Sequence, residues 1–298
     1  MSSYFILSKP ASERVDHDEK NQIIDPQSVS DHQDMYILPR VNIDYYRDHG
    51  LFEKALIEWS KQLCDPNWAM LDIGAHTGTY SIALANHCQH VYAFEPQKST
   101  YYALCGSVAL SNKTDKITCI NVALGTKEQS KRDDNTLKIR SLDGGGSSLF
   151  HISNVSNTPI TESVPTQNPT QTLSEGWLKG RTSPLPAQFQ SLVPASTETS
   201  IGVPTPTQTL SEEKIHVCTL DDMKIQNIRF IKLDVEYNEL SVLQGGKCTI
   251  HQNLPKILFE VNPEDAENKK AIFDFLTQEF NYKITAISGV NNMYLAHM

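Results

Sequence analysis

The stretch MLDIGAHTGTYSIAL, at residues 70–84, has the residue types and spacing of a cofactor-binding turn. An apolar run passes through two glycines into a helical pattern, which brings bare backbone close to a nucleotide-like ligand. A dinucleotide site would place glycines at positions 74, 76 and 79, but this chain has His76 and Thr79 at the last two. His76 would project an imidazole towards the pyrophosphate, so the turn argues against NAD or FAD.

A cofactor without a pyrophosphate still needs Gly74 and Gly78, because its amino-acid end would lie against the backbone of the turn. S-adenosylmethionine is such a ligand. Asp72, at the end of the strand, is placed to meet the ammonium of this ligand directly or through water, and Gly74 lets the chain pass close to the carboxylate. The expected cofactor contacts at the turn are Asp72, Gly74, Ala75, His76 and Gly78.

Two later strand ends supply candidates for the adenosine half of the cofactor. Glu95, in YAFEP, lies 21 residues after Gly74, and a carboxylate at that strand tip can accept both ribose hydroxyls. Asn121 and Ala123, in NVALG, would lie near the adenine. Core packing explains Ala123 equally well.

The acidic stretch KLDVEYNEL, at residues 232–240, is the candidate catalytic cluster. Asp234 ends a strand at the edge where ligands bind open sheets, and a buried carboxylate there is otherwise costly. Asp234 or Glu236 could accept the proton of an acceptor hydroxyl during methyl transfer. Alternatively, both could ligate Mg²⁺, which prefers oxygen ligands. The helix dipole is a sufficient structural explanation for Glu239 at the start of the next helix.

Strands and helices alternate along most of the chain, which predicts an α/β fold with a largely parallel sheet covered on both faces. An amphipathic helix is expected over 51–63, before the cofactor strand. The last two strands have no helical stretch between them, so they should form a hairpin. The predicted strands are 69–74, 90–95, 117–124, 228–235, 256–261, 282–287 and 293–297.

Two segments depart from this rhythm. Residues 1–34 are polar and aperiodic and are predicted to be a flexible N-terminal arm. Residues 35–298 form the expected catalytic domain, interrupted at 152–213 by a Pro/Ser/Thr-rich insertion with eight of the fifteen prolines and two copies of PTQTLSE. The insertion has too little apolar content to offset the entropy of ordering, so it is predicted to be an expanded surface loop or a tether for a protein partner.

The composition argues against several classes of partner. The net charge is −9 and no block of Lys or Arg occurs, which argues against nucleic acid and an anionic membrane as principal partners. The six cysteines show neither a CxxC pair nor zinc-like spacing, which favours reduced thiols. No apolar stretch approaches the roughly 20 residues of a membrane span, and the N-terminal apolar patch is short for a signal peptide. A cytoplasmic protein without membrane insertion is expected.

An ordered set of motifs carries a family resemblance. LDIGAHTGTYSIALA, VYAFEP, NVALG, GGGSSL, CTLDD and IRFIKLDVEYNELSVLQGG follow one another between about residues 66 and 262. In this set the chain resembles the FkbM-family S-adenosylmethionine-dependent methyltransferases. The resemblance implies a class I methyltransferase (Rossmann-like) fold, a seven-stranded, mostly parallel sheet with a C-terminal antiparallel hairpin. It also implies methyl transfer to a hydroxyl of a sugar or other small natural product.

The resemblance also suggests acceptor contacts. The family loop matched by Ser147 and Ser148 is expected near the active site. The family commonly has Gly directly after the Glu of the acidic motif, whereas this chain has Tyr237, which would narrow the acceptor pocket or stack on a sugar ring. The expected function is therefore O-methylation of a sugar, a glycan or a glycosylated metabolite. The alternatives are a nicotinamide-dependent sugar oxidoreductase and a non-catalytic scaffold that recruits a partner through the insertion.

Overall fold

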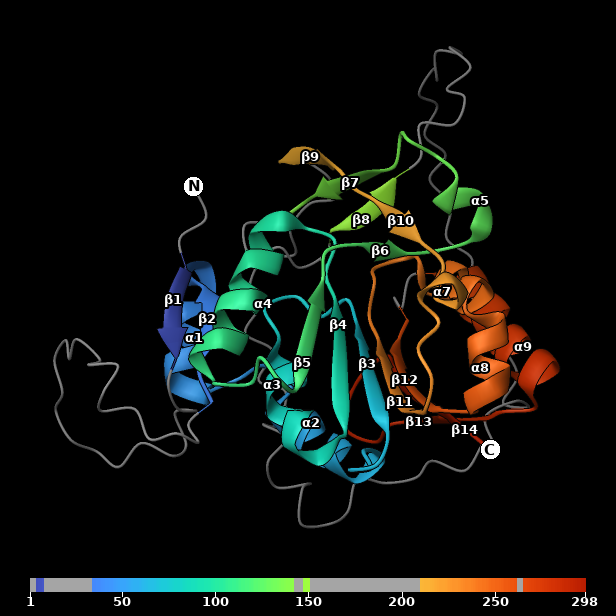
Figure 1. Cartoon of the computed structure of the whole chain (residues 1–298), viewed down its shortest axis with the longest axis horizontal. Coiled ribbons are helices and arrows are strands. Elements are labelled where there is room, and N and C mark those ends of the chain that lie inside the picture. The colour runs from blue at the N-terminus through green and yellow to red at the C-terminus, as the bar shows by residue number, and fades with distance from the viewer. Residues whose placement is uncertain (1–3, 8–33, 142–146, 151–209, 262–264) are drawn as a thin grey trace, which may run out of the picture.

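A computed structural model of the chain describes residues 4–7, 34–141, 147–150, 210–261 and 265–298 (Figure 1). Within these residues, a seven-stranded sheet has the order β13-β14-β12-β11-β3-β4-β5. Its strands are β3 (Ala69–Ile73), β4 (His90–Phe94), β5 (Ile117–Ile120), β11 (Ile228–Leu233), β12 (Lys256–Glu260), β13 (Lys283–Ala286) and β14 (Met293–His297).

The strand directions confirm the predicted architecture. Strands β5, β4, β3, β11 and β12 pair in parallel, whereas β14 is antiparallel to both β12 and β13. This order, with an antiparallel strand inside a parallel sheet, is the class I methyltransferase arrangement. All five residues of β3 are buried, including Asp72, because helices cover the sheet on both sides.

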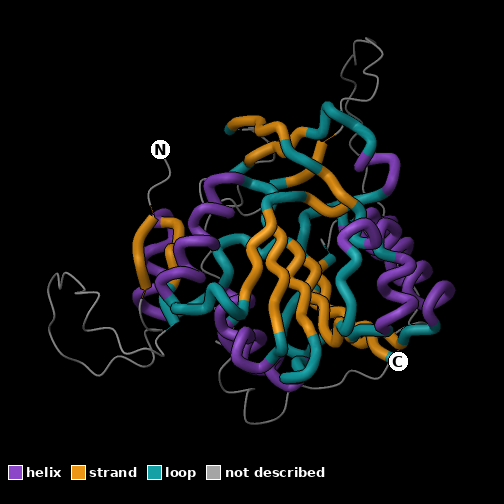
Figure 2. The backbone as a smooth tube through the Cα atoms, viewed as in Figure 1, coloured by secondary structure: helices purple, strands orange, loops and turns teal. Residues whose placement is uncertain are grey.

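Helices pack on both faces of the sheet (Figure 2). One face packs against α2, α3 and α4 through residues such as Leu56, Ile82 and Leu104. The other packs against α7, α8 and α9 through residues such as Leu243 and Leu276. These helices are α2 (Lys54–Ser60), α3 (Thr79–Leu84), α4 (Lys98–Leu110), α7 (Glu239–Gly245), α8 (Lys247–Asn253) and α9 (Ala266–Phe280).

A second layer of strands lies beyond the end of the central sheet (Figure 1). A three-stranded antiparallel sheet has the order β8-β7-β9, and β6 pairs in parallel with β10. Short helices connect these parts. The elements are β6 (Ala123–Leu124), α5 (Lys127–Ser130), β7 (Thr136–Ile139), β8 (Ser148–Phe150), β9 (Ser211–Lys214), β10 (Val217–Cys218) and η6 (Asp221–Met223).

The predicted strand 117–124 is two strands in the structure. Strand β5 ends at Ile120, where the Val122 N–H donates to the Ile120 carbonyl at 3.1 Å in a tight turn. The Ala123 N–H then donates to the His216 carbonyl at 2.9 Å, so β6 leaves the central sheet and joins β10. Apolar composition cannot locate such a turn.

The two predicted irregular segments contribute strands at their described ends. In the segment 1–34, Tyr4–Leu7 forms β1, which pairs antiparallel with β2 (Tyr36–Pro39), and Leu7 is buried. The end of the predicted insertion 152–213 forms β9, paired with β7. The other residues of both segments lie outside the described residues, apart from Asp34 and Leu210.

The helix expected over 51–63 begins later than the periodicity predicts, and helices that were not predicted precede it. Element η3 (Arg40–Asn42) leads into α1 (Ile43–His49), which is followed by Gly50, where φ is +79°. Glu53 has a left-handed backbone, so α2 starts at residue 54 rather than 51. The 3₁₀ segments η4 (Lys61–Leu63) and η5 (Ala85–His87) extend α2 and α3 respectively.

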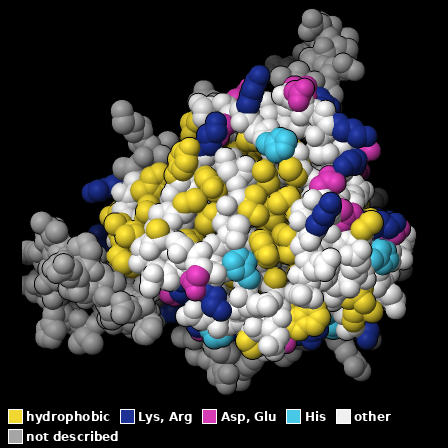
Figure 3. All heavy atoms as spheres, viewed as in Figure 1, with side chains coloured by type: hydrophobic (Ala, Val, Ile, Leu, Met, Phe, Trp, Pro, Cys, Tyr) yellow, Lys and Arg dark blue, Asp and Glu magenta, His cyan; other side chains and the backbone are white. Residues whose placement is uncertain are grey.

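The surface carries mixed charge on the face drawn in Figure 3. Hydrophobic side chains gather over the middle of this face, and Lys and Arg alternate with Asp and Glu along its upper and right margins. The described side chains on this face form no continuous basic stripe. None of the helices in the described ranges is long and apolar enough to cross a membrane.

Candidate functional site

A cavity of about 270 Å³ lies at the carboxyl ends of β3, β4 and β11. Ligands bind at this edge in open α/β sheets. Its walls come from the turn after β3, the residues between α1 and α2, the β5–β6 segment, the small sheet and the turn after β11. The described residues that line it are Asn42, Tyr46, Phe52, Glu53, Ile73, Gly74, Ala75, His76, Thr79, Tyr80, Phe94, Glu95, Pro96, Val122, Ala123, Leu124, Leu137, Ser147, Leu149, Lys232, Asp234, Val235, Glu236 and Asn238.

The turn after β3 is held by backbone contacts on two sides. The N–H groups of Gly74 and Ala75 both donate to the Phe94 carbonyl, at 3.0 and 2.9 Å. Gly74 has a φ of +83°, and a Cβ there would lie 1.7 Å from the Asp234 backbone oxygen. Glycine is therefore needed at position 74 for the close approach of the β3 and β11 turns.

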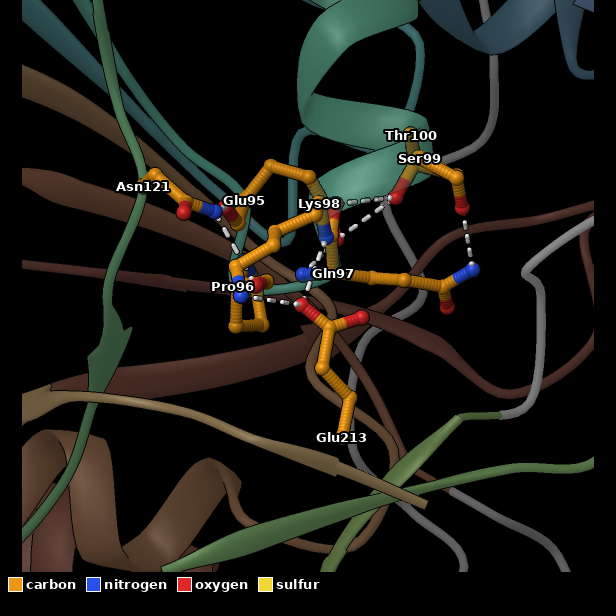
Figure 4. Close-up of polar contacts among 8 residues, drawn as sticks. All are labelled: Glu95, Pro96, Gln97, Lys98, Ser99, Thr100, Asn121 and Glu213. Atoms are coloured by element: carbon orange, nitrogen blue, oxygen red, sulfur yellow. Dashed lines mark hydrogen bonds and ion pairs between the residues drawn. The ribbon is translucent and has the colours of Figure 1, made fainter. Parts of the chain in front are cut away.

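Glu95 holds the opposite side of the turn, and Figure 4 draws its contacts with Gln97 and Thr100. Its Oε2 accepts the His76 N–H at 2.9 Å, and its Oε1 accepts the Gln97 N–H at 2.9 Å and the Thr100 hydroxyl at 3.0 Å. Burial raises the pKa of this carboxyl, and the nearby His76 and the three hydrogen bonds oppose that shift. Because Oε2 accepts a single bond from the protein, it retains capacity for a ligand hydroxyl.

The small sheet is attached to the start of α4 by side chains. The Ser147 hydroxyl donates to Gln97 Oε1 at 2.9 Å. From β9, Glu213 accepts the Lys98 N–H at 3.2 Å (Figure 4). Leu137 and Leu149 of the same sheet line the cavity. The sheet therefore contributes a wall of the cavity and is fixed to the segment between β4 and α4, which contains Glu95, and to the first residue of α4.

The turn after β11 brings Asp234 to the cavity beside a buried lysine. Lys232 is 5% exposed, and its Nζ lies 2.8 Å from Asp234 Oδ2. Burial by itself would lower the pKa of Lys232, but Asp234 and the neighbouring carboxylates raise it above its usual range. The lysine is therefore held as a cation.

Further acidic groups surround this ion pair. Asp72 is the parallel partner of Lys232 in the β3–β11 ladder and is 1% exposed. Burial raises its pKa, and Lys232 opposes the shift. The Lys232 Nζ also lies 5.0 Å from the centre of the Tyr80 ring, and the Tyr80 hydroxyl donates to Glu53 Oε2 at 2.9 Å. Lys232 thus lies among acidic groups from three separate parts of the chain.

The structure does not present a ready metal site in the described ranges. Among these residues, no three His, Cys, Asp or Glu side chains are arranged to hold a metal ion. One oxygen of Asp234 already contacts the Lys232 ammonium, which competes with a cation for that carboxylate. Ligation of Mg²⁺ by Asp234 and Glu236 stays a prediction.

Comparison with known protein families identifies the chain. The model of the methyltransferase FkbM domain matches residues 72–284, which is more than half of the 298 residues. The chain belongs to the FkbM methyltransferase family. The match contains the β3 turn, Glu95 and the β11 turn, so the whole cavity edge of the sheet belongs to the family domain. A search of curated proteins gave no match.

Several solved structures are similar to this FkbM chain. The methyltransferase FkbM of Methylobacillus flagellatus KT has 14% identity and a TM-score of 0.44 over 78% of this chain, which spans only 44% of that one. SMU.1697c of Streptococcus mutans, solved in complex with SAH, has 8% identity and a TM-score of 0.43 over 83% of this chain and 100% of its own. An rRNA methylase of Streptococcus thermophilus has 8% identity and a TM-score of 0.41 over 83% and 96%.

Most predicted site residues of this FkbM domain lie at one cavity. Its lining includes Gly74, Ala75, His76, Glu95, Ala123, Ser147, Asp234 and Glu236. Ser148 belongs to β8, and its side chain lies outside the described part of the structure.

Four predicted residues lie outside the lining. Asp72 is buried behind it and accepts the Ser81 hydroxyl at 2.6 Å. Gly78 packs under α4, where a Cβ would lie 2.6 Å from Leu104. The Asn121 amide donates to the Glu95 and Pro96 carbonyls, so it holds the strand end (Figure 4).

Tyr237 is the fourth of these residues. It is 44% exposed and has a φ of +69°, directly after Glu236 at +50°. Such a backbone suits glycine, which explains the glycine that the family commonly has at this position. Stacking of Tyr237 on an acceptor stays a prediction.

Sequence reasoning missed Lys232, Glu53, Tyr80 and Asn238. Lys232 precedes Asp234 by two residues, so β alternation places both on one face of the sheet, and this signal was available. Asn238 is buried, and its amide donates to the Leu124 carbonyl at 3.0 Å. Glu53 and Tyr80 meet across 27 residues, and their contact has no local sequence signal.

Proposed function

We propose that the chain is an S-adenosylmethionine-dependent O-methyltransferase that acts on a hydroxyl of a sugar, a glycan or a glycosylated metabolite. The observation that supports this best is that one cavity is lined by the turn after β3, by Glu95 and by the Asp234 carboxylate. Methyl transfer requires a donor site and a proton acceptor that face the same space.

The chemistry of the lining residues fits the cofactor. Glu95 Oε2 offers lone pairs to a ribose hydroxyl, and Ile73, Phe94 and Val122 offer apolar walls to an adenine. The turn from Gly74 to His76 exposes backbone to the amino-acid end of the cofactor. Asp72 Oδ1 is buried without a hydrogen-bond partner and lies behind the lining, so we assign to it a contact with the ammonium through water.

Asp234 is the proposed proton acceptor. When bound, S-adenosylmethionine would supply an electrophilic methyl group: its S–C bond would break as the acceptor oxygen forms the C–O bond, and the sulfonium would become a neutral thioether. The acceptor oxygen loses its proton in this step, and the Asp234 carboxylate takes it. The Lys232 ammonium, 2.8 Å from Oδ2, orients the carboxylate towards the cavity. Proton transfer to a positioned side chain contributes roughly 10²–10⁴-fold to rate.

Mass spectrometry tests this function directly. The purified chain is incubated with S-adenosylmethionine that carries an isotopically labelled methyl group and with a panel of sugars and lipid-linked glycans. The proposal expects the label on an oxygen of one class of acceptor and an equal amount of S-adenosylhomocysteine. Label found only on nitrogen or carbon, or no transfer across the panel, would contradict O-methylation of a glycan acceptor.

A further inference from the structure

The cavity has a wall that the proposed donor half does not use. We call Asn42, Tyr46, Phe52 and Glu53 the N-terminal wall, because all four precede β3 in the chain. We infer that this wall selects a hydroxylated acceptor that bears a protonated amine and rejects one that bears a phosphate. The inference rests on the proposed methyl-transfer function and specifies its substrate class.

The charges around the cavity favour a cationic acceptor. Among the described lining residues, the acidic side chains are Glu53, Glu95, Asp234 and Glu236, whereas the basic groups are Lys232 and His76. No arginine belongs to this described lining. An anion that entered would meet like charges with little screening, and juxtaposed like charges suppress binding.

The lysine of the cavity is not available to a phosphate. Lys232 is 5% exposed, pairs with Asp234 at 2.8 Å and lies against the Tyr80 ring. A phosphate that took this ammonium would leave Asp234 and the buried Asp72 without their cation. Breaking a buried pair in that way is strongly destabilising, because it leaves an uncompensated buried charge.

The N-terminal wall offers an aromatic face beside a carboxylate. Phe52 is 39% exposed, stacks on Tyr45 at a centroid distance of 4.0 Å and meets Tyr46 edge-on at 4.9 Å. These contacts hold the ring in place at the cavity. A fixed, accessible ring attracts an ammonium through its quadrupole.

The Glu53 carboxylate supplies the charge. Its Oε2 accepts the Tyr80 hydroxyl, and within the described residues no lysine, arginine or histidine forms an ion pair with it. Burial raises its pKa, Lys232 opposes the shift and Asp234 adds to it. Negative charge on Glu53 is therefore undercompensated, and a ligand ammonium next to Phe52 would compensate it.

Sugars that differ in charge test the inference by binding alone. Glucosamine, glucose and glucose 6-phosphate are titrated near neutral pH into the protein saturated with S-adenosylhomocysteine, in an isothermal calorimeter. We expect glucosamine to bind at least tenfold more tightly than glucose 6-phosphate and measurably more tightly than glucose. Glucose 6-phosphate binding as well as glucosamine, no gain of glucosamine over glucose, or no binding of glucosamine would each overturn the inference.

Two variants locate the selectivity. Glu53→Gln keeps the size of the side chain and should reduce the preference for glucosamine over glucose severalfold. Glu58→Gln, on α2 outside the cavity and paired with Lys61, is the control and should keep the preference. An unchanged preference in Glu53→Gln would contradict the assignment to the N-terminal wall. If the methyl-transfer proposal itself failed, S-adenosylhomocysteine would not bind, which is a separate observation.

Discussion

Glu95 shows how one side chain serves both local structure and a predicted ligand. Three protein donors hold its carboxylate, and they come from the β3 turn, the β4 end and α4. The same carboxylate lines the cavity. Its position at the strand tip was predicted from spacing alone, whereas the network that fixes its rotamer depends on contacts made only after folding.

Replacement of Glu95 should weaken the cofactor complex. Glu95→Ala removes a charge-assisted acceptor, worth about 1.5–3 kcal/mol, so the Kd for S-adenosylmethionine should rise roughly ten- to a hundredfold. Isothermal titration calorimetry measures it. Thr100→Val is the matched control, because it removes one hydrogen bond to Oε1 from a residue outside the lining. The control should lose stability and keep its Kd within about threefold.

Replacement of Asp234 should lower turnover and leave cofactor binding unchanged. Asp234→Asn keeps an oxygen that accepts from Lys232 but cannot take a proton, so kcat should fall by roughly 10²–10⁴ while cofactor binding is preserved. Stopped reactions with labelled cofactor and the acceptor found by mass spectrometry give kcat and KM separately. Equal loss of cofactor binding in the Glu95 and Asp234 variants would refute this division of roles.

Single site residues could be predicted from the sequence where they directly follow a predicted strand. Gly74, Glu95 and Asp234 all end strands, and parallel strands bring their carboxyl ends to one edge. The contact between Glu53 and Tyr80 depends on how α2 packs against α3, which residue types and spacing do not encode locally.

At the scale of elements, the two turn glycines should respond differently to substitution. Both have positive φ, which costs alanine about 1–2 kcal/mol. A Cβ at Gly74 would strike the Asp234 backbone, whereas a Cβ at Gly78 would meet the end of the Leu104 side chain, which can rotate. Gly74→Ala should cost at least about 3 kcal/mol of unfolding free energy and Gly78→Ala about 1–3. Urea denaturation compares them, and equal losses would contradict the role of the β3–β11 approach.

The start of α7 should make stability depend on pH. Burial raises the pKa of Glu239 to about 7, with Asp234 and Glu236 adding to the shift, so desolvation outweighs the favourable helix dipole. The folded state then holds a proton that the unfolded chain releases above about pH 4.5. This contribution is fully present below about pH 4.5 and is lost as pH rises through about 7.

Glu239→Gln should remove this dependence. Relative to the natural chain, the variant should gain roughly 2–4 kcal/mol of stability between about pH 4.5 and 8.5. Denaturation curves over that range measure the gain. Glu267→Gln, at an exposed site on α9, is the control and should leave the profile unchanged. A Glu239 variant whose stability changes with pH as much as the natural chain would contradict the buried, protonated state.

Elements were predictable where burial is continuous. The seven central strands follow apolar runs, because parallel strands are covered on both faces. The small sheet was not predicted, since β7, β8 and β9 are short, β9 is largely charged, and their pairing joins residues about 75 positions apart along the chain. Nothing in the local pattern of SEEK signals a strand.

At the scale of the whole molecule, the insertion should be dispensable for cofactor binding if the deletion keeps β8 and β9. Two strand spacings separate β8 from β9 by about 10 Å, and their offset along β7 adds about 10 Å. A six-residue Gly/Ser linker, which reaches about 20 Å, can therefore replace residues 152–209.

This replacement should keep the Kd for S-adenosylmethionine within about threefold, and calorimetry checks it. Deletion of 152–213 also removes most of β9 and the Glu213 contact to Lys98, so its melting temperature should fall by several degrees. Both deletion variants would lose a partner that binds through the insertion. If the variant that lacks only residues 152–209 did not bind the cofactor, the claim that the domain binds it without the insertion would be wrong.

The most direct measurement of the central claim is a calorimetric comparison of S-adenosylmethionine with NADH on the full chain. We expect one S-adenosylmethionine bound per chain, displaced by S-adenosylhomocysteine and weakened by Glu95→Ala. We expect no effect of NADH, because His76 stands where a dinucleotide-binding turn has its second glycine. Binding of NADH without binding of S-adenosylmethionine would contradict the assignment of this cavity to a methyl donor.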